Sequence, residues 1–390
     1  MPALVSLMRV WATMVGRAAA TWVARGRSSR FSSAVGSLTG GSIVEKPIKI
    51  AIAGGGYGRK VALPVYAELE EFEPVAVWSR RPERARELAE EAGVELGTAD
   101  FDELLSAPGL EAVHVATPVA THEQFAVAAA ERGLHVLCEK PLADNLEGAR
   151  RIVTAIGSAG VVGLVDYELR MKETRRRIIE RAREVVGQPR MASVSLVQSD
   201  HADPDSRPYT WVHDDRLGGG RLQGYGVHDL DLLLEIFPDV DAVAAATEVG
   251  VPMRTADDGE LRPVTAEDTY ALLLRFRGGG LGVATLVATA RHGRGDVIEI
   301  HGDEGTVRLD SDRRIWWGRA GEELQREGPL DASSTEAFKR VARNFWAAIR
   351  QGAAPEPSLE EGLRVQAIFD AVRTADIERR WVQPKPVTLF

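Results

Sequence analysis

The fold is decided by residues 46–58, which read KPIKIAIAGGGYG. Residues 46–53 form a short, largely apolar run, which is typical of a strand buried on both faces. The chain then enters a glycine cluster at residues 54–58. Glycines between a buried strand and a helix let the backbone approach a pyrophosphate at the helix N-terminus. The motif is weak by itself, because Arg59 stands where the strict G-x-G-x-x-G pattern has its third glycine.

Outward from this stretch, short apolar runs alternate with helical patterns of about ten residues. Strands are predicted at residues 74–78, 112–116, 135–138 and 161–165, and helices at residues 60–69, 82–92, 122–132 and 146–156. This alternation indicates βαβ units and a parallel sheet. We therefore expect residues 46–165 to form a doubly wound, Rossmann-type domain that binds a dinucleotide.

A different pattern begins near residue 166. Strands are predicted at residues 191–198, 270–276, 282–288, 297–301 and 306–309. They follow one another closely and are separated by glycine-containing turns. We expect residues 166–390 to form an α+β domain with an open, mostly antiparallel sheet, so that the whole chain is an α/β protein. Residues 254–263 are polar and are expected to be a surface loop.

Composition limits the classes of function. The chain has 390 residues, with 48 lysines and arginines and 57 aspartates and glutamates, which gives a net charge of −9. Such an acidic chain argues against a surface for nucleic acid or for anionic membranes, and no apolar run is long enough to span a membrane. Cys138 is the single cysteine, which excludes a disulfide framework and a cysteine-cluster metal site. His201, Asp203, His213 and Asp214 lack a metal-ligand spacing, so they are interpreted as a polar loop and no metal is expected.

Residues 1–45 differ in composition from the rest. Up to residue 44 they hold five arginines and neither aspartate nor glutamate. An Arg-rich, Ser-rich and acid-poor segment is typical of a transit peptide, whereas a disordered tail or translation from an upstream start gives the same composition. We expect a cytoplasmic protein, with targeting to an organelle as the alternative that the extension leaves.

The end of the second predicted strand bears on the choice of cofactor. Enzymes that use NAD place an acidic residue there, to bind the ribose hydroxyls. Here the strand is followed by Ser79, Arg80 and Arg81, and no carboxylate is present. A guanidinium pairs with phosphate through a planar fork of donors. These residues therefore favour NADP, with NAD as the alternative, unless both arginines are only solvated surface charges.

Three further motifs follow the predicted strands and helices. Ala116-Thr117-Pro118 precedes His122, Glu139-Lys140-Pro141 follows the next strand, and Gly226-Val227-His228 comes after a glycine triplet at residues 218–220. Together with the glycine loop, these spaced motifs resemble the Gfo/Idh/MocA family of sugar and polyol oxidoreductases. The resemblance runs from about residue 48 to about residue 382.

The resemblance implies roles for particular residues. The cofactor would contact Gly54, Gly56, Tyr57, Gly58, Ser79, Arg80, Arg81, Thr117, Pro118, His122, Glu139 and Lys140. Lys140 would also reach the reacting oxygen of the substrate, and His228 would lie across from it, so both are candidate catalytic residues. Tyr167, Arg170 and Tyr225 are further candidates for substrate contact. In the family the second sheet closes the substrate site and makes subunit contacts, which implies a homodimer or homotetramer.

The chemistry of the two candidate catalytic side chains is consistent with hydride transfer. A lysine ammonium polarises a carbonyl or helps to remove a hydroxyl proton, and a histidine titrates close to neutral pH and moves that proton. The family has an Asp four residues before this histidine, whereas this chain has Gly224. Tyr225 and Asp229 are candidates to replace the carboxylate, and spacing alone does not decide between them.

These residues predict an NAD(P)-dependent dehydrogenase or reductase that interconverts a secondary alcohol and a ketone on a sugar, polyol or related ring. Two alternatives stay open. One is a non-catalytic nucleotide-sensing protein of the same fold, which Gly224 permits and the intact Glu139-Lys140 pair opposes. The other is a glycosidase that holds NAD tightly and returns it unchanged. The identity of the substrate is not readable from the residues.

Overall fold

The computed structural model describes residues 46–205 and 207–387. The expectations for residues 1–45 concern a segment outside this part of the chain. Among the described residues, no helix combines the length and the apolar composition that a membrane crossing requires.

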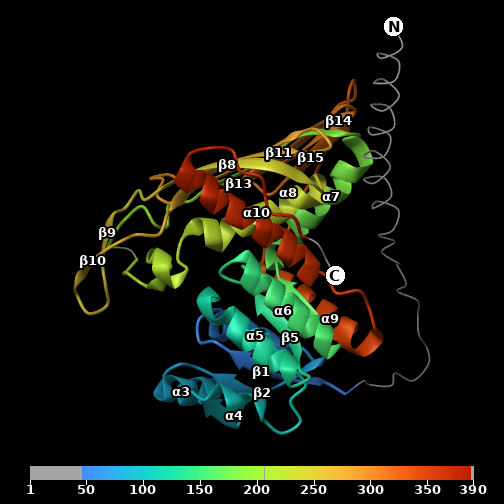
Figure 1. The fold of residues 1–390 in the computed structure, drawn as a ribbon. Coiled ribbons are helices and arrows are strands. Elements are labelled where there is room, and N and C mark those ends of the chain that lie inside the picture. The colour runs from blue at the N-terminus through green and yellow to red at the C-terminus, as the bar shows by residue number, and fades with distance from the viewer. Residues whose placement is uncertain (1–45, 206, 388–390) are drawn as a thin grey trace.

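The N-terminal part is a parallel sheet with the strand order β3-β2-β1-β4-β5-β6 (Figure 1). Its strands are β1 (Ile48–Ala53), β2 (Phe72–Trp78), β3 (Leu96–Thr98), β4 (Ala112–Val115), β5 (His135–Glu139) and β6 (Gly163–Asp166). Its helices are the π-helical turn η1 (Gly58–Ala62), α2 (Leu63–Glu68), α3 (Pro82–Ala92), α4 (Phe101–Leu105), α5 (His122–Glu131) and α6 (Leu146–Ala159). The doubly wound domain predicted from the sequence is confirmed.

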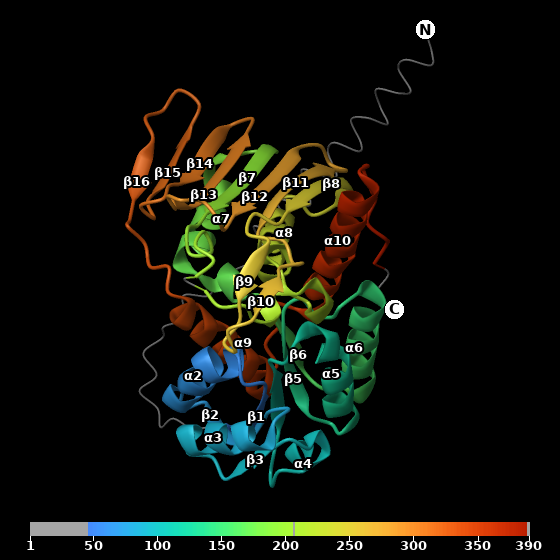
Figure 2. The ribbon, with the colours of Figure 1, turned by 90° about the vertical axis from the view of Figure 1, so that its left-hand side faces the viewer.

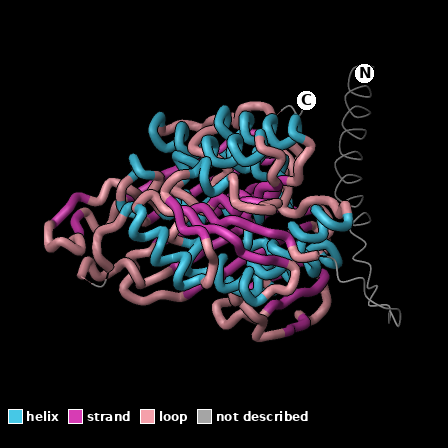
Figure 3. The backbone as a smooth tube through the Cα atoms, turned by 90° about the horizontal axis from the view of Figure 1, so that it is seen from below, coloured by secondary structure: helices cyan, strands magenta, loops and turns pink. Residues whose placement is uncertain are grey.

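Strand β1 explains why this sheet is apolar without alternation. Ile48, Ile50 and Ile52 belong to one buried cluster, and Ala51 and Ala53 belong to another. A parallel sheet that is covered on both faces buries every residue of its central strands. Figure 3 shows the strands lying between layers of helices.

The C-terminal part builds a second sheet with the order β16-β15-β14-β13-β7-β12-β11-β8. Its strands are β7 (Pro189–Val197), β8 (Val240–Glu248), β11 (Thr269–Phe276), β12 (Leu281–Val287), β13 (Gly295–Gly302), β14 (Gly305–Leu309), β15 (Ile315–Arg319) and β16 (Gln325–Glu327). Neighbouring strands are antiparallel except for β7 and β12. The helices α7 (Glu173–Val185), α8 (Val227–Ile236) and α10 (Leu359–Glu378) cover the face that is turned toward the first domain (Figure 2). The predicted open, mostly antiparallel sheet is confirmed.

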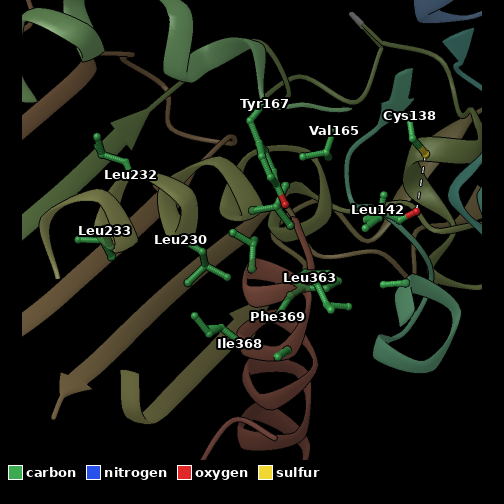
Figure 4. Close-up of a cluster of buried hydrophobic side chains, with 14 of the residues drawn as sticks. Cys138, Leu142, Val165, Tyr167, Leu230, Leu232, Leu233, Leu363, Ile368 and Phe369 are labelled. Carbon is green, nitrogen blue, oxygen red and sulfur yellow. Dashed lines mark hydrogen bonds between the residues drawn. The ribbon is translucent and has the colours of Figure 1, made fainter. Parts of the chain in front are cut away.

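Helix α9 (Ser334–Gln351) returns from the second sheet to the first domain. The ring of Phe338 lies 5.6 Å from that of Tyr66 and 5.5 Å from that of His114, and α9 shares a buried cluster with β1 and α2. A second cluster joins the loops after β5 and β6 to α8 and α10, and part of it is drawn in Figure 4. The predicted division at residue 165 therefore separates two sheets but not two independent cores.

The segment expected to be a surface loop, residues 254–263, is a hairpin of β9 (Met253–Thr255) and β10 (Leu261–Pro263). Strand β10 is exposed, as a polar sequence predicts, but Arg254 is among the largest fully buried side chains. The expectation of a loop was wrong. Two strands pair through their backbone N–H and C=O groups, and a polar sequence has these groups just as an apolar one does.

Candidate active site

The carboxyl ends of the parallel strands meet at one edge of the first sheet, and the loops after β1, β2, β4, β5 and β6 gather there. Ligands of doubly wound folds bind at this edge. The residues assigned to the cofactor from the sequence lie in or just behind these loops, so the topology brings them together.

The glycines of the loop after β1 have different tasks. Gly54 has a φ of +131°, and a Cβ there would lie 2.1 Å from the carbonyl oxygen of Ala116 on the neighbouring strand connection. A Cβ on Gly58 would lie 2.8 Å from Cγ2 of Ile52, so this glycine lets the helix approach β1. A Cβ on Gly56 would meet no atom within 4 Å, so this face of the loop is open. The loop thus offers exposed backbone on its outer side, which is the surface that a pyrophosphate needs.

The loop after β2 lies beside the glycine loop, because the Gly54 N–H donates to the Trp78 carbonyl at 3.0 Å. Ser79 is half-buried, whereas Arg80 and Arg81 are exposed. Neither guanidinium makes a hydrogen bond or an ion pair within the described residues, although exposed arginines elsewhere in the chain commonly pair with carboxylates, as Arg59 does with Glu91. Both are therefore free to meet an anionic ligand.

His122 supports the cofactor edge from behind. It is fully buried, with Nε2 2.9 Å from the Thr117 carbonyl and Nδ1 3.0 Å from the Pro141 carbonyl. The ring thus links the loop that carries Thr117 and Pro118 to the loop that carries Lys140. The sequence-based assignment of His122 as a cofactor contact disagrees with this burial, since a contact side chain must reach the open edge.

Behind Lys140 lies a buried group of three residues, His114, Glu139 and Asp166, of which the sequence motifs pointed only to Glu139. His114 Nε2 is 3.5 Å from Glu139 Oε1, and within the described part of the chain neither oxygen of the fully buried Asp166 has a hydrogen-bond partner. Burial and the neighbouring Glu139 raise the pKa of Asp166, so its carboxyl is held neutral and can share a proton with Glu139. One ligand atom from each of the three lies within 4.8 Å of the others, which is the composition of a metal site.

Tyr57 faces this buried group rather than solvent. Its ring packs edge-on against Phe338 at 5.8 Å, and its hydroxyl is buried and has no hydrogen-bond partner among residues 46–205 and 207–387. Burial, together with Asp166 and other carboxylates, raises the pKa of this phenol. Tyr57 is therefore a neutral donor at the inner end of the glycine loop.

Lys140 links the two domains at the centre of the site. Its ammonium donates to the carbonyl oxygen of Gly224 at 2.8 Å. Gly224 belongs to the π-helical turn η6 (Leu222–Gly226) that leads into α8. The position that lacks the expected carboxylate thus contributes a backbone acceptor, which orients the lysine and leaves its other protons for a ligand.

A carboxylate does reach His228, from another element. Glu168 lies in the short helix η3 (Glu168–Met171) after β6, and its Oε2 is 3.4 Å from Nε2 of His228. Burial raises the pKa of Glu168 to about 7. Burial and the nearby Lys140 charge hold the pKa of His228 well below its usual value, so the imidazole is neutral at pH 7. Close to neutral pH, the proton of this pair is therefore gained and lost at Glu168.

The other candidates near His228 have different partners. Asp229 accepts from Arg175 at 3.1 Å and from the Tyr270 hydroxyl at 2.6 Å, so it is not the missing carboxylate. Tyr225 lies beneath the guanidinium of Arg221, 5.1 Å from its ring centre. Neither side chain takes the place of the Asp that was expected at the position of Gly224.

Tyr167 and Arg170 were candidates for substrate contact, and both lie away from the open edge. Tyr167 is buried in the core drawn in Figure 4, where its ring packs edge-on against His228 at 5.8 Å. Arg170 is 7% exposed and donates to Asp231 at 3.0 Å and to Glu361 at 2.9 Å. The structure therefore makes Tyr167 a support for His228, and it corrects the assignment of Arg170, whose guanidinium is already neutralised.

A cavity of about 180 Å³ opens beside Lys140. Its far wall comes from the second domain and includes His201, His213 of η4 (Trp211–His213), Arg221 and Arg254. Trp211 also lines the cavity while remaining 47% exposed. The site therefore consists of a cofactor edge in one domain, a polar cavity in the other, and Lys140 between them.

Two family models match the chain. One is described as an oxidoreductase family with an NAD-binding Rossmann fold and matches residues 48–167; the other is the C-terminal alpha/beta domain of that family and matches residues 182–383. A levoglucosan dehydrogenase of Pseudarthrobacter phenanthrenivorans is 27% identical and covers 86% of this chain and 97% of its own length. A myo-inositol 2-dehydrogenase of Thermotoga maritima is 26% identical, with 80% of this chain and 91% of that protein covered.

Solved structures extend the likeness to the fold. Levoglucosan dehydrogenase in complex with NADH and L-sorbose matches with a TM-score of 0.76 at 25% identity, over 87% of this chain and 99% of that one. An oxidoreductase domain protein from Kribbella flavida matches with a TM-score of 0.77 at 27% identity, over 87% of this chain and all of that one (100%). Both matches span the two sheets, so they concern the whole described fold.

Proposed function

We propose, from the premise that this chain belongs to the Gfo/Idh/MocA oxidoreductase family, that it interconverts a secondary alcohol and a ketone on a sugar, polyol or related ring. The chain is an NAD(P)-dependent dehydrogenase. The observation that carries the proposal is Lys140, whose oriented ammonium lies between the cofactor edge and the polar cavity. Relatives named as levoglucosan and myo-inositol dehydrogenases support a polyhydroxylated ring as the substrate class.

The cofactor edge fits a nicotinamide dinucleotide. The open side of Gly56 leaves room for the pyrophosphate, and Ser79 lies at the end of β2 where the adenosine ribose would reach. When bound, the nicotinamide ring supplies the hydride acceptor or donor. We propose that NADP(H) is preferred to NAD(H), because the unpaired guanidiniums of Arg80 and Arg81 stand where NAD enzymes carry a carboxylate.

Lys140 handles the charge on the substrate oxygen. Its bond to the Gly224 carbonyl fixes the ammonium in place, and its remaining protons can donate to a carbonyl or to an oxygen that is becoming an alkoxide. The buried carboxyl groups of Glu139 and Asp166 lie behind this lysine, and burial together with Glu139 raises the pKa of Asp166.

His228 and Glu168 handle the proton. In the direction of oxidation the neutral imidazole accepts the hydroxyl proton, and the adjacent Glu168 carboxylate stabilises the imidazolium that forms. His228 Nδ1 is buried and has no hydrogen-bond partner within the described chain, and we assign the proton exchange to this atom. Helix η3, through Glu168, thus supplies the carboxylate that is missing at position 224.

The test is a substrate screen with both cofactors. The purified protein is incubated with hexoses, inositols, anhydrosugars and their keto forms, and nicotinamide absorbance near 340 nm is followed with NAD(H) and with NADP(H). Reversible, cofactor-dependent oxidation of at least one ring alcohol is expected. Tight cofactor binding without turnover on the whole panel would instead indicate a nucleotide sensor. Hydrolysis of a glycoside without added cofactor would indicate the glycosidase.

A further inference from the structure

The cavity beside Lys140 presents donors without acceptors. Several buried polar atoms of its lining residues lack a hydrogen-bond partner among the described residues, and all of them are nitrogens: His201 Nε2, His213 Nε2, Arg221 Nε, Gln223 Nε2 and Arg254 Nε. Of the oxygens of the two lining carboxylates, Oε1 of Glu267 and both oxygens of Asp268 accept hydrogen bonds from neighbouring N–H groups. Glu267 accepts from the Leu222 N–H at 2.7 Å, and Asp268 accepts from the Gly250 and Val251 N–H groups.

The state of His213 follows from its surroundings. The backbone N–H of Thr210 donates to Nδ1 at 3.0 Å, so that nitrogen is an acceptor. Burial and the nearby Arg254 lower the pKa of His213 to about 4, which keeps the ring neutral at pH 7. A neutral ring that accepts at Nδ1 carries its proton on Nε2. The unpartnered Nε2 of His213 is therefore an N–H that awaits an acceptor.

Arg254 gives the strongest single indication that the cavity binds a negatively charged group. Its side chain is 1% exposed, and its guanidinium donates to the backbone carbonyls of His201, at 2.5 Å, and of Asp203 and Arg207. It makes no ion pair with a carboxylate of a described residue. Buried charges in proteins are ordinarily paired, because an isolated one is expensive to desolvate. Its Nε is buried and has no hydrogen-bond partner among the described residues, and the side chain is one of those that line the cavity.

The charges around the cavity do not cancel. The cationic lining residues are Lys140, Arg207, Arg221 and Arg254, and the acidic ones are Glu267 and Asp268. Burial raises the pKa of Glu267 to about 7, so it carries only part of a negative charge at neutral pH. Asp200, outside the lining, pairs with Arg207 at 2.7 Å and lies 3.5 Å from Arg221. An excess of positive charge and of N–H donors remains.

We infer that the substrate of this site is an anionic sugar, which carries a carboxylate or phosphate oxyanion against His213, Arg221, Gln223 and Arg254 while its reacting carbinol lies at Lys140. An oxyanion offers several acceptor lone pairs and a negative charge, which are what this wall lacks. A neutral polyol brings a donor with every hydroxyl acceptor, so it would leave the charge of Arg254 unmatched. This inference rests on the proposed dehydrogenase site and narrows its substrate class.

The experiment compares ligands that differ only in the anion. Protein saturated with NADPH, and in a parallel series with NADH, is titrated calorimetrically with D-glucuronate, D-glucose 6-phosphate and D-glucose, and with the corresponding galacto and manno sets. In at least one set an anionic member is expected to bind about tenfold or more tightly than the neutral hexose, as charge-assisted hydrogen bonds predict. The carboxylate and phosphate arms distinguish the two sources of the oxyanion.

Two variants and one control locate the effect. Arg221→Gln removes a guanidinium from the wall and is expected to bring the ratio of anionic to neutral affinity close to one. Gln223→Leu removes a donor that has no partner among the described residues, so it should lower the ratio without a cost to folding. Arg216→Gln makes the same charge change at a side chain that is 80% exposed and outside the lining, and should leave the ratio unchanged.

The outcomes separate this inference from the proposed function. Equal affinity for neutral and anionic members in all three sets would overturn the inference, as would equal losses in Arg221→Gln and Arg216→Gln. Oxidation of neutral rings without preference for acids would leave the dehydrogenase standing and remove the anion site. Selective binding of an acid without hydride transfer to either cofactor would support the anion site and contradict the proposed reaction.

Discussion

At the scale of single residues, Lys140 is the group on which both the cofactor edge and the cavity depend. Lys140→Met keeps the length of the side chain and removes the ammonium, so the developing charge on the substrate oxygen loses its donor. We expect turnover to fall by about 10²–10⁴-fold, as for other lost acid–base groups, and cofactor affinity to stay within a few-fold of wild type. Steady-state kinetics and a cofactor titration measure the two separately. Near-normal turnover in the variant would remove Lys140 from the mechanism.

Glu168 gives a second residue-scale prediction, with a defined sign. Its pKa of about 7 means that the carboxyl gains its charge as the pH rises through neutrality, and a charged Glu168 stabilises a protonated His228. Alcohol oxidation should therefore rise with pH around 7 in the wild type. In Glu168→Gln this inflection should disappear and turnover should fall by about 10²-fold.

The pH–rate profile of kcat is the measurement for Glu168→Gln. Glu131→Gln, at an exposed position, is the matched control and should keep the wild-type profile. An inflection near pH 7 that survives in Glu168→Gln would show that another group titrates there.

The same residues show how much of the site can be predicted from the sequence. Lys140 and the glycines were predictable because each motif is contiguous and follows a strand. Glu168 was not, since it lies 60 positions before His228 and only the fold brings them together. Asp229, next to His228 on α8, looked plausible by sequence. Successive helical side chains point about 100° apart, and Asp229 consequently faces Arg175 and Tyr270.

At the scale of elements, the turn from β2 into α3 should decide between the two cofactors. Arg80 and Arg81 are exposed and unpaired there, so a 2′-phosphate would gain charge-assisted bonds worth roughly 1.5–3 kcal/mol each. We expect tighter binding of NADPH than of NADH in the wild type. The Arg80→Ala/Arg81→Ala variant should lose that preference and retain NADH affinity.

Calorimetric titration with both reduced cofactors tests this preference. Arg86→Ala, an exposed arginine further along α3, is the control for a general loss of positive charge. Equal or tighter NADH binding by the wild type would contradict the NADP assignment.

A helix or strand was predictable from the sequence to the extent that its own residues favour that structure. Helix α3 (Pro82–Ala92) agrees with its prediction at both ends, since a proline opens it and Gly93, with a φ of +66°, closes it. Strand β8 (Val240–Glu248) was missed because its alanine-rich sequence, VDAVAAATE, has little strand propensity. It forms because β11 provides a backbone partner along most of its length. Tertiary pairing overrode local preference there, as it did in the β9–β10 hairpin.

At the scale of the whole molecule, the chain passes from the first domain to the second and back. Three basic residues of helix α9 form ion pairs with glutamates of the first domain: Lys339 with Glu68 at 2.6 Å, Arg343 with Glu71 at 3.0 Å and Arg350 with Glu111 at 2.8 Å. These exposed pairs contribute little individually. The apolar face of α9 contributes more, because it covers β1 and α2. The cofactor edge is therefore held in place by a segment about 170 residues beyond the end of its own sheet.

Phe338 is where this dependence can be measured. Its ring is fully buried, stacks on His114 at 5.5 Å, and contacts the rings of Tyr57 and Tyr66. Phe338→Ala should lower the free energy of unfolding by about 3–5 kcal/mol, the usual cost of a deleted core aromatic ring. Because His114 and Tyr57 border Glu139 and the glycine loop, the folded variant should also bind its cofactor more weakly.

Arg340→Ala, on the exposed side of α9, is the control, and its free energy of unfolding should stay within about 0.5 kcal/mol of wild type. Urea unfolding and cofactor titration of both variants provide the comparison. If Phe338→Ala were as stable as Arg340→Ala, the first domain would not need the returning helix, and the division at residue 165 would mark two separable units after all.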